Sequence, residues 1–347
     1  MNILTLGNNY CTRILSEKLA ENTENKIFST TNGKNVSFVD IPLLCFENFI
    51  HFIKENNIEL VIPVDFKIIE SEFSTLCIKE NISVFAPFDE ALNITGSKSF
   101  AKKFFYKNNI LTPKFIVVEK IQSALEYIKN VDYPIVLKPD CHSENLETEF
   151  AENYIQAKKI VDKFWANDVG VIVIEEFIEG VEFSAYAITD GFNIKLIDLT
   201  STKNNRYAYL GSNHITKEEK ENIVENYFKP IILSLAQNNS EYVGIIGIDF
   251  IKDRNGEIYA LECNPFFENL DIELFTRAIE FDLVDMFENV LLGTFIEKYQ
   301  KVELNNKNYV SFVNNNGKIE TYEGRTLSEA IEFSECEELK KELLWKF

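Results

Sequence analysis

One segment restricts the fold of this chain more than any other. Residues 247–265 combine a tight turn with acidic side chains on both flanking runs. Asn255-Gly256 stands between two stretches of alternating apolar and polar residues, a pattern typical of a β-hairpin with a two-residue type I′ turn. That turn predicts that Arg254 pairs with Glu257.

Counting outward from that turn places Asp249 directly opposite Glu262, with Asn264 on the same face. Facing carboxylates repel each other, so the pair is either exposed, where salt screens the repulsion, or neutralised by a cation. Two carboxylates and an amide oxygen on one face are hard ligands suited to a magnesium-like ion. The hairpin alone leaves both interpretations open, because charged residues are mostly exposed and a longer turn would change the register.

Length and charge narrow the class of protein. The 347 residues predict two or three domains, and a composition of 46% hydrophobic and 26% charged residues is that of a folded globular chain. The net charge of -20 argues against sequence-independent binding of nucleic acid and against anionic membranes. Nucleotides remain compatible, because they need only a local cluster of lysines and backbone amides.

Cysteine usage and the N-terminal residues indicate the compartment. The six cysteines are dispersed without a CxxC pair, which favours reduced thiols over disulfides or a zinc site. Residues 1–7 lack the basic stretch and the apolar run of a signal peptide, and the longest apolar runs have the length of strands. We therefore expect a cytoplasmic protein.

Strand and helix signals alternate in the N-terminal part, which predicts an open parallel sheet covered by helices. The expected strands there are 2–6, 60–64 and 84–86, and the expected helices are 12–21, 46–56 and 68–80. Further along, we expect strands at 115–118, 135–138, 171–174, 183–189 and 193–199, helices at 99–108, 121–129, 156–164, 217–238 and 272–292, and a hairpin at 314–317.

Two lysines stand in unusual places. Lys98 lies just inside the start of a predicted helix, where the helix dipole disfavours a cation, and Lys138 ends an apolar strand. Each is either a surface residue or a phosphate ligand, and a local conflict of this kind often indicates function.

An acidic connector follows the predicted strand 171–174. The run from Glu175 to Ser184 contains four glutamates. Its backbone can offer a carbonyl and an N–H to an adenine edge, and a carboxylate a few residues on can accept both ribose hydroxyls. The alternative is a solvated acidic loop.

Taken in order, four motifs resemble the ATP-grasp superfamily. They are Gly96-Ser97-Lys98 at a helix start, an apolar strand ending in Lys138-Pro139, the acidic run 175–184, and paired acidic strands ending in Glu262-Cys263-Asn264-Pro265. The likeness is greatest to phosphoribosylamine–glycine ligase and related carboxylate–amine ligases, and it covers roughly residues 1–295.

The resemblance implies an α/β fold that is α+β in its ATP-grasp part. An open parallel-sheet domain, residues 1–94, would precede a two-lobed ATP-grasp domain, residues 95–295. The nucleotide would lie between the lobes, the smaller of which spans about 112–178, and residues 296–347 would form a short C-terminal region.

The resemblance also implies ATP with Mg²⁺ or Mn²⁺ as cofactors and a role for each candidate residue. These roles are phosphate contacts for Lys98 and Lys138; adenine contacts for Glu175 or Glu176 and the backbone of Phe177 and Ile178; a ribose contact for Glu182; metal binding for Asp249, Glu262 and Asn264; and contacts to the transferred phosphate for Lys203 and Arg206.

The implied reaction joins a small-molecule carboxylate to a small-molecule amine. The carboxylate attacks the γ-phosphate to give an acylphosphate, and the amine then displaces phosphate. The protein would contribute positioning and charge neutralisation, as in other phosphoryl transfers. Similar folds often form dimers, so the resemblance is compatible with a homodimer.

Three departures distinguish this chain from the resemblance. Residues 140–154, where relatives carry a glycine-rich loop, contain no glycine and four glutamates. Phe266 follows Pro265 where many relatives have an arginine, for which Arg277 is either a substitute or a surface residue. Residues 62–66 replace the loop for the amine substrate, which favours a ligation other than purine synthesis. The alternative function is a degenerate ATP-grasp protein that binds a nucleotide or a small ligand without turnover.

Overall fold

The computed structural model describes residues 1–69, 71–140, 146–203, 207–210, 215–238, 240, 242–278, 289–290, 307–314, 318–334 and 337. The chain divides into two compact units. Unit 1 comprises residues 1–89, 183–247 and 264–347, and unit 2 comprises residues 90–182 and 248–263. The predicted division at residues 94 and 295 stays a prediction.

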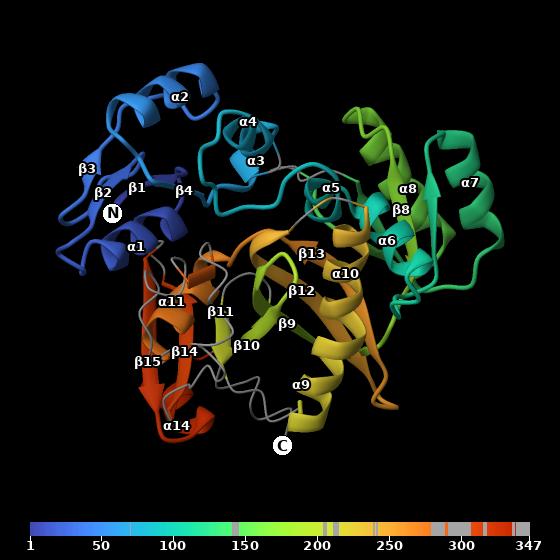
Figure 1. The fold of residues 1–347 in the computed structure, drawn as a ribbon. Coiled ribbons are helices and arrows are strands. Elements are labelled where there is room, and N and C mark those ends of the chain that lie inside the picture. Colours follow the sequence, from blue (N-terminus) through green and yellow to red (C-terminus); the bar gives the residue numbers. More distant parts are fainter. Residues whose placement is uncertain are drawn as a thin grey trace. The chain divides into compact units, whose positions relative to one another are not determined.

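Unit 1 begins with a parallel sheet in the order β3-β2-β1-β4, which confirms the predicted parallel sheet. The strands are β1 (Asn2–Leu6), β2 (Lys26–Ser29), β3 (Ser37–Phe38) and β4 (Leu60–Pro63) (Figure 1). The helices are α1 (Tyr10–Leu19), α2 (Phe46–Glu55), α3 (Phe66–Ile69) and α4 (Phe73–Lys79).

The single helix expected at 68–80 is wrong, because the chain forms α3 and α4 instead. The hydroxyl of Ser71 donates to the carbonyl of Ile68 and accepts from the N–H of Phe73. A serine that bonds the backbone in this way competes with helical hydrogen bonds, which explains the interruption.

A seven-stranded sheet has the order β13-β12-β9-β10-β11-β14-β15. Its strands are β9 (Gly180–Asp190), β10 (Ile194–Lys203), β11 (Tyr207–Leu210), β12 (Val243–Asp253), β13 (Ile258–Asn264), β14 (Asn308–Val313) and β15 (Ile319–Gly324). The predicted hairpins of β9 with β10 and of β14 with β15 are confirmed, and β14 also pairs with β11.

The helix expected at 217–238 contains a wider turn. It consists of α9 (Lys217–Ile223), a π-helical turn (Val224–Phe228) and α10 (Lys229–Gln237). Pro230 is the second residue of α10 and has no N–H to donate to the preceding turn, which accounts for an irregularity just before it. Unit 1 also contains α11 (Asn269–Ala278) and α14 (Leu327–Phe333), and most of the helix predicted at 272–292 lies outside the described residues.

Unit 2 contains an antiparallel sheet in the order β5-β8-β6-β7. Its strands are β5 (Phe115–Val118), β6 (Ile135–Pro139), β7 (Glu149–Ala151) and β8 (Ile172–Glu176). Its helices are α5 (Glu90–Gly96), α6 (Lys98–Lys107), α7 (Ile121–Asn130) and α8 (Tyr154–Ala166), and α7 and α8 pack on the sheet over an aliphatic core.

The predicted two-residue turn between β12 and β13 is wrong. The N–H of Asp253 donates to Glu257 O at 2.9 Å and that of Gly256 to Asp253 O at 3.1 Å, so the loop has three residues. The Asp253 carboxylate accepts from the N–H groups of Asn255 and Glu257, which favours this longer loop. Arg254, which was predicted to lie opposite Glu257, is a loop residue, and its side chain forms an ion pair with Glu179.

Asp249 was predicted to lie opposite Glu262 by counting residues outward from a two-residue turn. Because the loop has three residues, this pairing no longer follows from the count. Their strands, β12 and β13, are nevertheless neighbours in the sheet. Among the described residues, no helix is long and apolar enough to cross a membrane.

Candidate functional site

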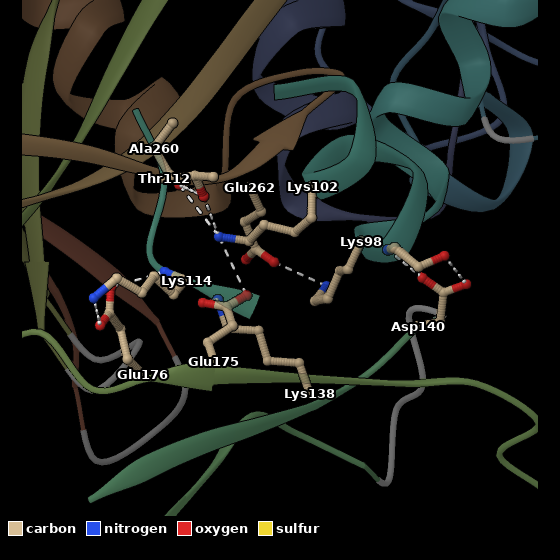
Figure 2. A network of polar contacts seen from close by, with 11 residues as sticks. Lys98, Lys102, Thr112, Lys114, Lys138, Asp140, Glu175, Glu176, Ala260 and Glu262 are labelled. Carbon is tan, nitrogen blue, oxygen red and sulfur yellow. Dashed lines mark hydrogen bonds and ion pairs between the residues drawn. The ribbon is translucent and has the colours of Figure 1, made fainter. Parts of the chain in front are cut away.

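Five charged side chains of unit 2 form what we call the lysine–glutamate cluster (Figure 2). Helix α6 supplies two lysines one turn apart, β6 supplies a lysine near its end, and β8 and β13 supply one glutamate each. The members are Lys98, Lys102, Lys138, Glu175 and Glu262.

Lys98 is the first residue of α6, as predicted. Ser97 caps the helix by accepting the N–H of Phe100 at 3.1 Å. The Asp140 carboxylate accepts from the N–H and hydroxyl of Ser99, and this negative charge at the helix N-terminus offsets the unfavourable placement of a lysine there. The Nζ atom of Lys98 lies 2.9 Å from Oε2 of Glu262.

Lys102 is a site residue that the sequence reasoning missed. Its side chain is 0% exposed, and its Nζ atom lies 3.2 Å from Oε1 of Glu175. It also donates to Oγ1 of Thr112 at 2.7 Å and to the carbonyl of Ala260 at 3.3 Å. Burial lowers the pKa of Lys102 to about 8, although the charge of Glu175 opposes that change.

Lys138, near the end of β6, lies 3.3 Å from the other carboxylate oxygen of Glu175. Burial alone would lower the pKa of Lys138, but nearby carboxylates outweigh burial and raise the pKa above its usual value. Those carboxylates belong to Glu175, Glu262 and Asp249. Lys138 therefore remains a cation at neutral pH and can attract an anion.

The structure distinguishes the two adjacent glutamates that the sequence left as alternatives. Glu175 is buried between Lys102 and Lys138. Glu176 points away from them and accepts the N–H of Lys114 at 2.8 Å (Figure 2). Glu175 is thus the one that belongs to the cluster.

The segment after β8 contains the remaining residues predicted for the base and the sugar. The N–H of Phe177 donates to the carbonyl of Pro134 at 3.3 Å, so this donor is already used within the protein. Ile178 follows in the connection to β9, and Glu182 lies in β9. All these residues belong to unit 2.

The residues predicted to bind metal lie on two strands. Asp249 is in β12, while Glu262 and Asn264 are in β13. Burial raises the pKa of the Cys263 thiol, and the charges of Asp249 and Glu262 raise it further, so both acids lie near that thiol. Two carboxylates on neighbouring strands fit a hard divalent cation, provided that other oxygens complete the coordination.

Among the residues that the structure describes, no group of three or more histidines, cysteines and acids could hold a metal ion by itself. A metal held by Asp249 and Glu262 would accordingly need further oxygen ligands, such as those of a bound molecule. Asn264 is 3% exposed and belongs to unit 1.

Lys203, predicted to contact the transferred phosphate, and Arg277, the possible substitute for an arginine after Pro265, belong to unit 1. Lys203 ends β10, and Arg206 lies outside the described residues. Arg277, in α11, donates through Nε to Oε1 of Glu273 at 2.7 Å. The structure thus brings Lys98, Lys138 and Glu175 together in the cluster of unit 2, and it does not test the roles of Lys203, Arg206 and Arg277.

The fold and the lysine–glutamate cluster define an ATP-grasp protein. In fold, the chain is similar to phosphoribosylamine–glycine ligase from Thermotoga maritima, with a TM-score of 0.76 and 19% identity over 98% of this chain and 96% of that one. It is also similar to the biotin carboxylase domain of 2-oxoglutarate carboxylase from Hydrogenobacter thermophilus, solved with MgADP, with a TM-score of 0.73 and 15% identity over 90% and 74%.

A protein-family model described as phosphoribosylglycinamide synthetase, ATP-grasp (A) domain, matches residues 96–272, and the chain belongs to this family. A similar curated protein is phosphoribosylamine–glycine ligase of Clostridium acetobutylicum, 27% identical over 314 residues, which cover 82% of this chain and 74% of that protein. That of Caldanaerobacter subterraneus is 24% identical over 341 residues, which cover 90% and 80%.

These comparisons confirm the predicted resemblance and the predicted fold class. They also confirm the prediction of an enzyme of the ATP-dependent C–N ligase class.

Proposed function

We propose that this protein is an ATP- and magnesium-dependent ligase that joins a small carboxylate to a small amine through an acylphosphate. Family membership supports the class of reaction. The observation that carries the proposal is the buried lysine–glutamate cluster, because two buried lysines sharing one carboxylate provide positive charge for an anionic ligand.

In this proposal, Lys98 and Lys138 bind the phosphates of ATP. The backbone of Phe177 and Ile178 recognises adenine, and Glu182 accepts the ribose hydroxyls. Glu175, whose two carboxylate oxygens face Lys102 and Lys138, orders these lysines instead of contacting the base. Because the N–H of Phe177 already donates to Pro134, its carbonyl and the N–H of Ile178 are the groups proposed for the base edge.

Asp249, Glu262 and Asn264 are the proposed metal ligands, with phosphate oxygens as the other ligands. When bound, Mg²⁺ would neutralise negative charge on the phosphates. Glu262 already lies against Lys98, so in this proposal it orients a phosphate-binding lysine as well as the metal.

In the proposed reaction, a substrate carboxylate oxygen attacks the γ-phosphorus and the bond to ADP breaks. The amine nitrogen then attacks the acyl carbon, phosphate leaves, and the nitrogen loses a proton. Lys203 and Arg206 are the proposed contacts to the transferred phosphoryl group, and Arg277 is proposed to steady the acylphosphate. A cytoplasmic location and a homodimer stay predictions.

The test is turnover with mixtures of candidate substrates. The protein is incubated with ATP and Mg²⁺ against pools of amino acids and small carboxylic acids, and ADP and phosphate are followed. We expect one pool to release both, and we expect a Lys138→Met variant to release neither. Tight ATP binding with no ADP from any pool would refute the ligase proposal in favour of nucleotide binding without turnover.

A further inference from the structure

The ammonium group of Lys102 is enclosed by protein groups. Its Nζ atom donates hydrogen bonds to Oγ1 of Thr112 and to the carbonyl of Ala260, and Oε1 of Glu175 lies 3.2 Å away as an ion-pair partner. With its side chain 0% exposed, Lys102 has no surface that a ligand could contact. Its charge therefore acts on other protein groups.

Glu175 is the charged group on which Lys102 acts. One carboxylate oxygen faces Lys102 at 3.2 Å, and the other faces Lys138 at 3.3 Å, so one negative charge is shared by two ammonium groups (Figure 2). The side chain of Lys138 is 7% exposed, so Lys138 is the one of the two that a ligand can reach.

We propose that Lys102 is a positioning residue for the nucleotide phosphates. By holding Oε1 of Glu175, it prevents the carboxylate from pairing with Lys138 alone, and Lys138 keeps positive charge to offer to a phosphate. The inference rests on the proposed function, because it takes the nucleotide phosphate as the ligand of Lys138. Removing the charge of Lys102 would leave a buried carboxylate with one ammonium partner, and that partner would then bind anions less well.

A purely structural role for Lys102 makes a different prediction. Lys102 connects α6 to β8, to β13 and to the segment containing Thr112. If these connections were its whole contribution, losing them would weaken every ligand of the site to a similar extent. Adenosine, which has no phosphate, separates the two roles.

The experiment measures equilibrium binding of ADP with Mg²⁺, and of adenosine, by titration calorimetry. For Lys102→Met we expect the ADP dissociation constant to rise about tenfold or more, as for loss of a charged hydrogen-bond partner. Binding of adenosine is expected to change less than about twofold. Lys103→Met is the matched control, because Lys103 is the next residue of α6 and is exposed, and it should change neither ligand.

A second pair of variants keeps the test decisive if Lys102→Met fails to fold. In a Glu175→Gln background the carboxylate charge is gone, so the route from Lys102 to Lys138 through that carboxylate is removed. The ratio of ADP to adenosine affinity should therefore be the same with and without Lys102→Met. A further tenfold fall in that ratio would show that Lys102 acts by another route and would overturn the inference.

The experiment distinguishes failure of the proposed function from failure of the inference about Lys102. A wild-type protein that binds no ADP would overturn the proposed function and this inference with it. A wild-type protein that binds ADP, with Lys102→Met behaving like Lys103→Met, would overturn only the inference. Equal weakening of ADP and adenosine in Lys102→Met would also overturn the inference, in favour of a structural role.

Discussion

One buried acid of unit 2 and one buried acid of unit 1 have opposite kinds of partner. In unit 2, Glu175 lies between the ammonium groups of Lys102 and Lys138. In unit 1, the carboxylate of Asp271 is 1% exposed and accepts a hydrogen bond from the neutral hydroxyl of Tyr186 at 2.5 Å. Burial raises the pKa of Asp271 to about 6, against an ordinary value of 3.8.

The partners of each buried carboxylate determine its effect on the protein. A buried carboxylate whose partners are two ammonium groups orders those groups, and the surplus of positive charge around it attracts an anion. A buried carboxylate that meets a hydroxyl gains too little to offset its desolvation, and it moves toward the neutral form. We therefore expect the cluster of unit 2 to control ligand binding and Asp271 to control stability.

The largest expected effect is at Lys138. Lys138→Met removes the ammonium group assigned to phosphate and should weaken ADP binding roughly 100-fold, because charged hydrogen bonds are lost in a buried site. Titration calorimetry with MgADP measures it. Lys114→Met is the control, since Lys114 is 90% exposed and pairs with Glu176 outside the cluster. Similar ADP affinities of Lys138→Met and Lys114→Met would contradict the expectation that the lysine–glutamate cluster of unit 2 controls ligand binding.

The second prediction concerns the pH dependence of stability at Asp271. Because its folded pKa of about 6 exceeds the ordinary value of 3.8, the folded state binds more protons than the unfolded state between these pH values. Stability from this group is therefore highest below about pH 4 and falls as pH rises through 6, by about 3 kcal/mol at most. Asp271→Asn cannot titrate and should lack this fall.

Urea unfolding at pH 4.5 and pH 7 measures the effect as the difference between wild type and Asp271→Asn. The variant should gain stability relative to wild type at the higher pH. Tyr186→Phe serves as the control, because it keeps the carboxyl group and hence a pH dependence while losing one hydrogen bond. Parallel pH profiles for wild type and Asp271→Asn would show that the acid is charged in the folded protein throughout.

The features that were predicted correctly from the sequence are those that local residue patterns determine. The parallel sheet of unit 1 follows from alternating strand and helix signals. Lys98 and Lys138 were found because each conflicts with its own local surroundings, a helix dipole in one case and an apolar strand in the other.

The missed features depend on partners far away in sequence. Lys102 looks like an ordinary helix residue, and its burial becomes evident only when Glu175 and Ala260 are placed beside it. One signal was available: Lys102 lies four residues after Lys98, so both occupy one face of α6, where like charges are unfavourable without acids nearby. The turn at Asn255-Gly256 was misjudged because the carboxylate of Asp253 bonds the loop backbone.

The smallest predicted effect is in that loop, which belongs to unit 2 but lies outside its cluster. Gly256 has a φ of 89°, a left-handed conformation that costs alanine about 1 kcal/mol, and no atom lies within 4 Å of an added Cβ. Gly256→Ala should lower the free energy of unfolding by that amount and leave ADP binding unchanged.

Gly170→Ala is the matched control, because Gly170 has equally open surroundings without a positive φ. The free energy of unfolding of Gly170→Ala should differ from that of wild type by only about a few tenths of a kcal/mol. A loss of ADP affinity in Gly256→Ala would mean that the hairpin loop, and not only the lysine–glutamate cluster, determines nucleotide binding in unit 2.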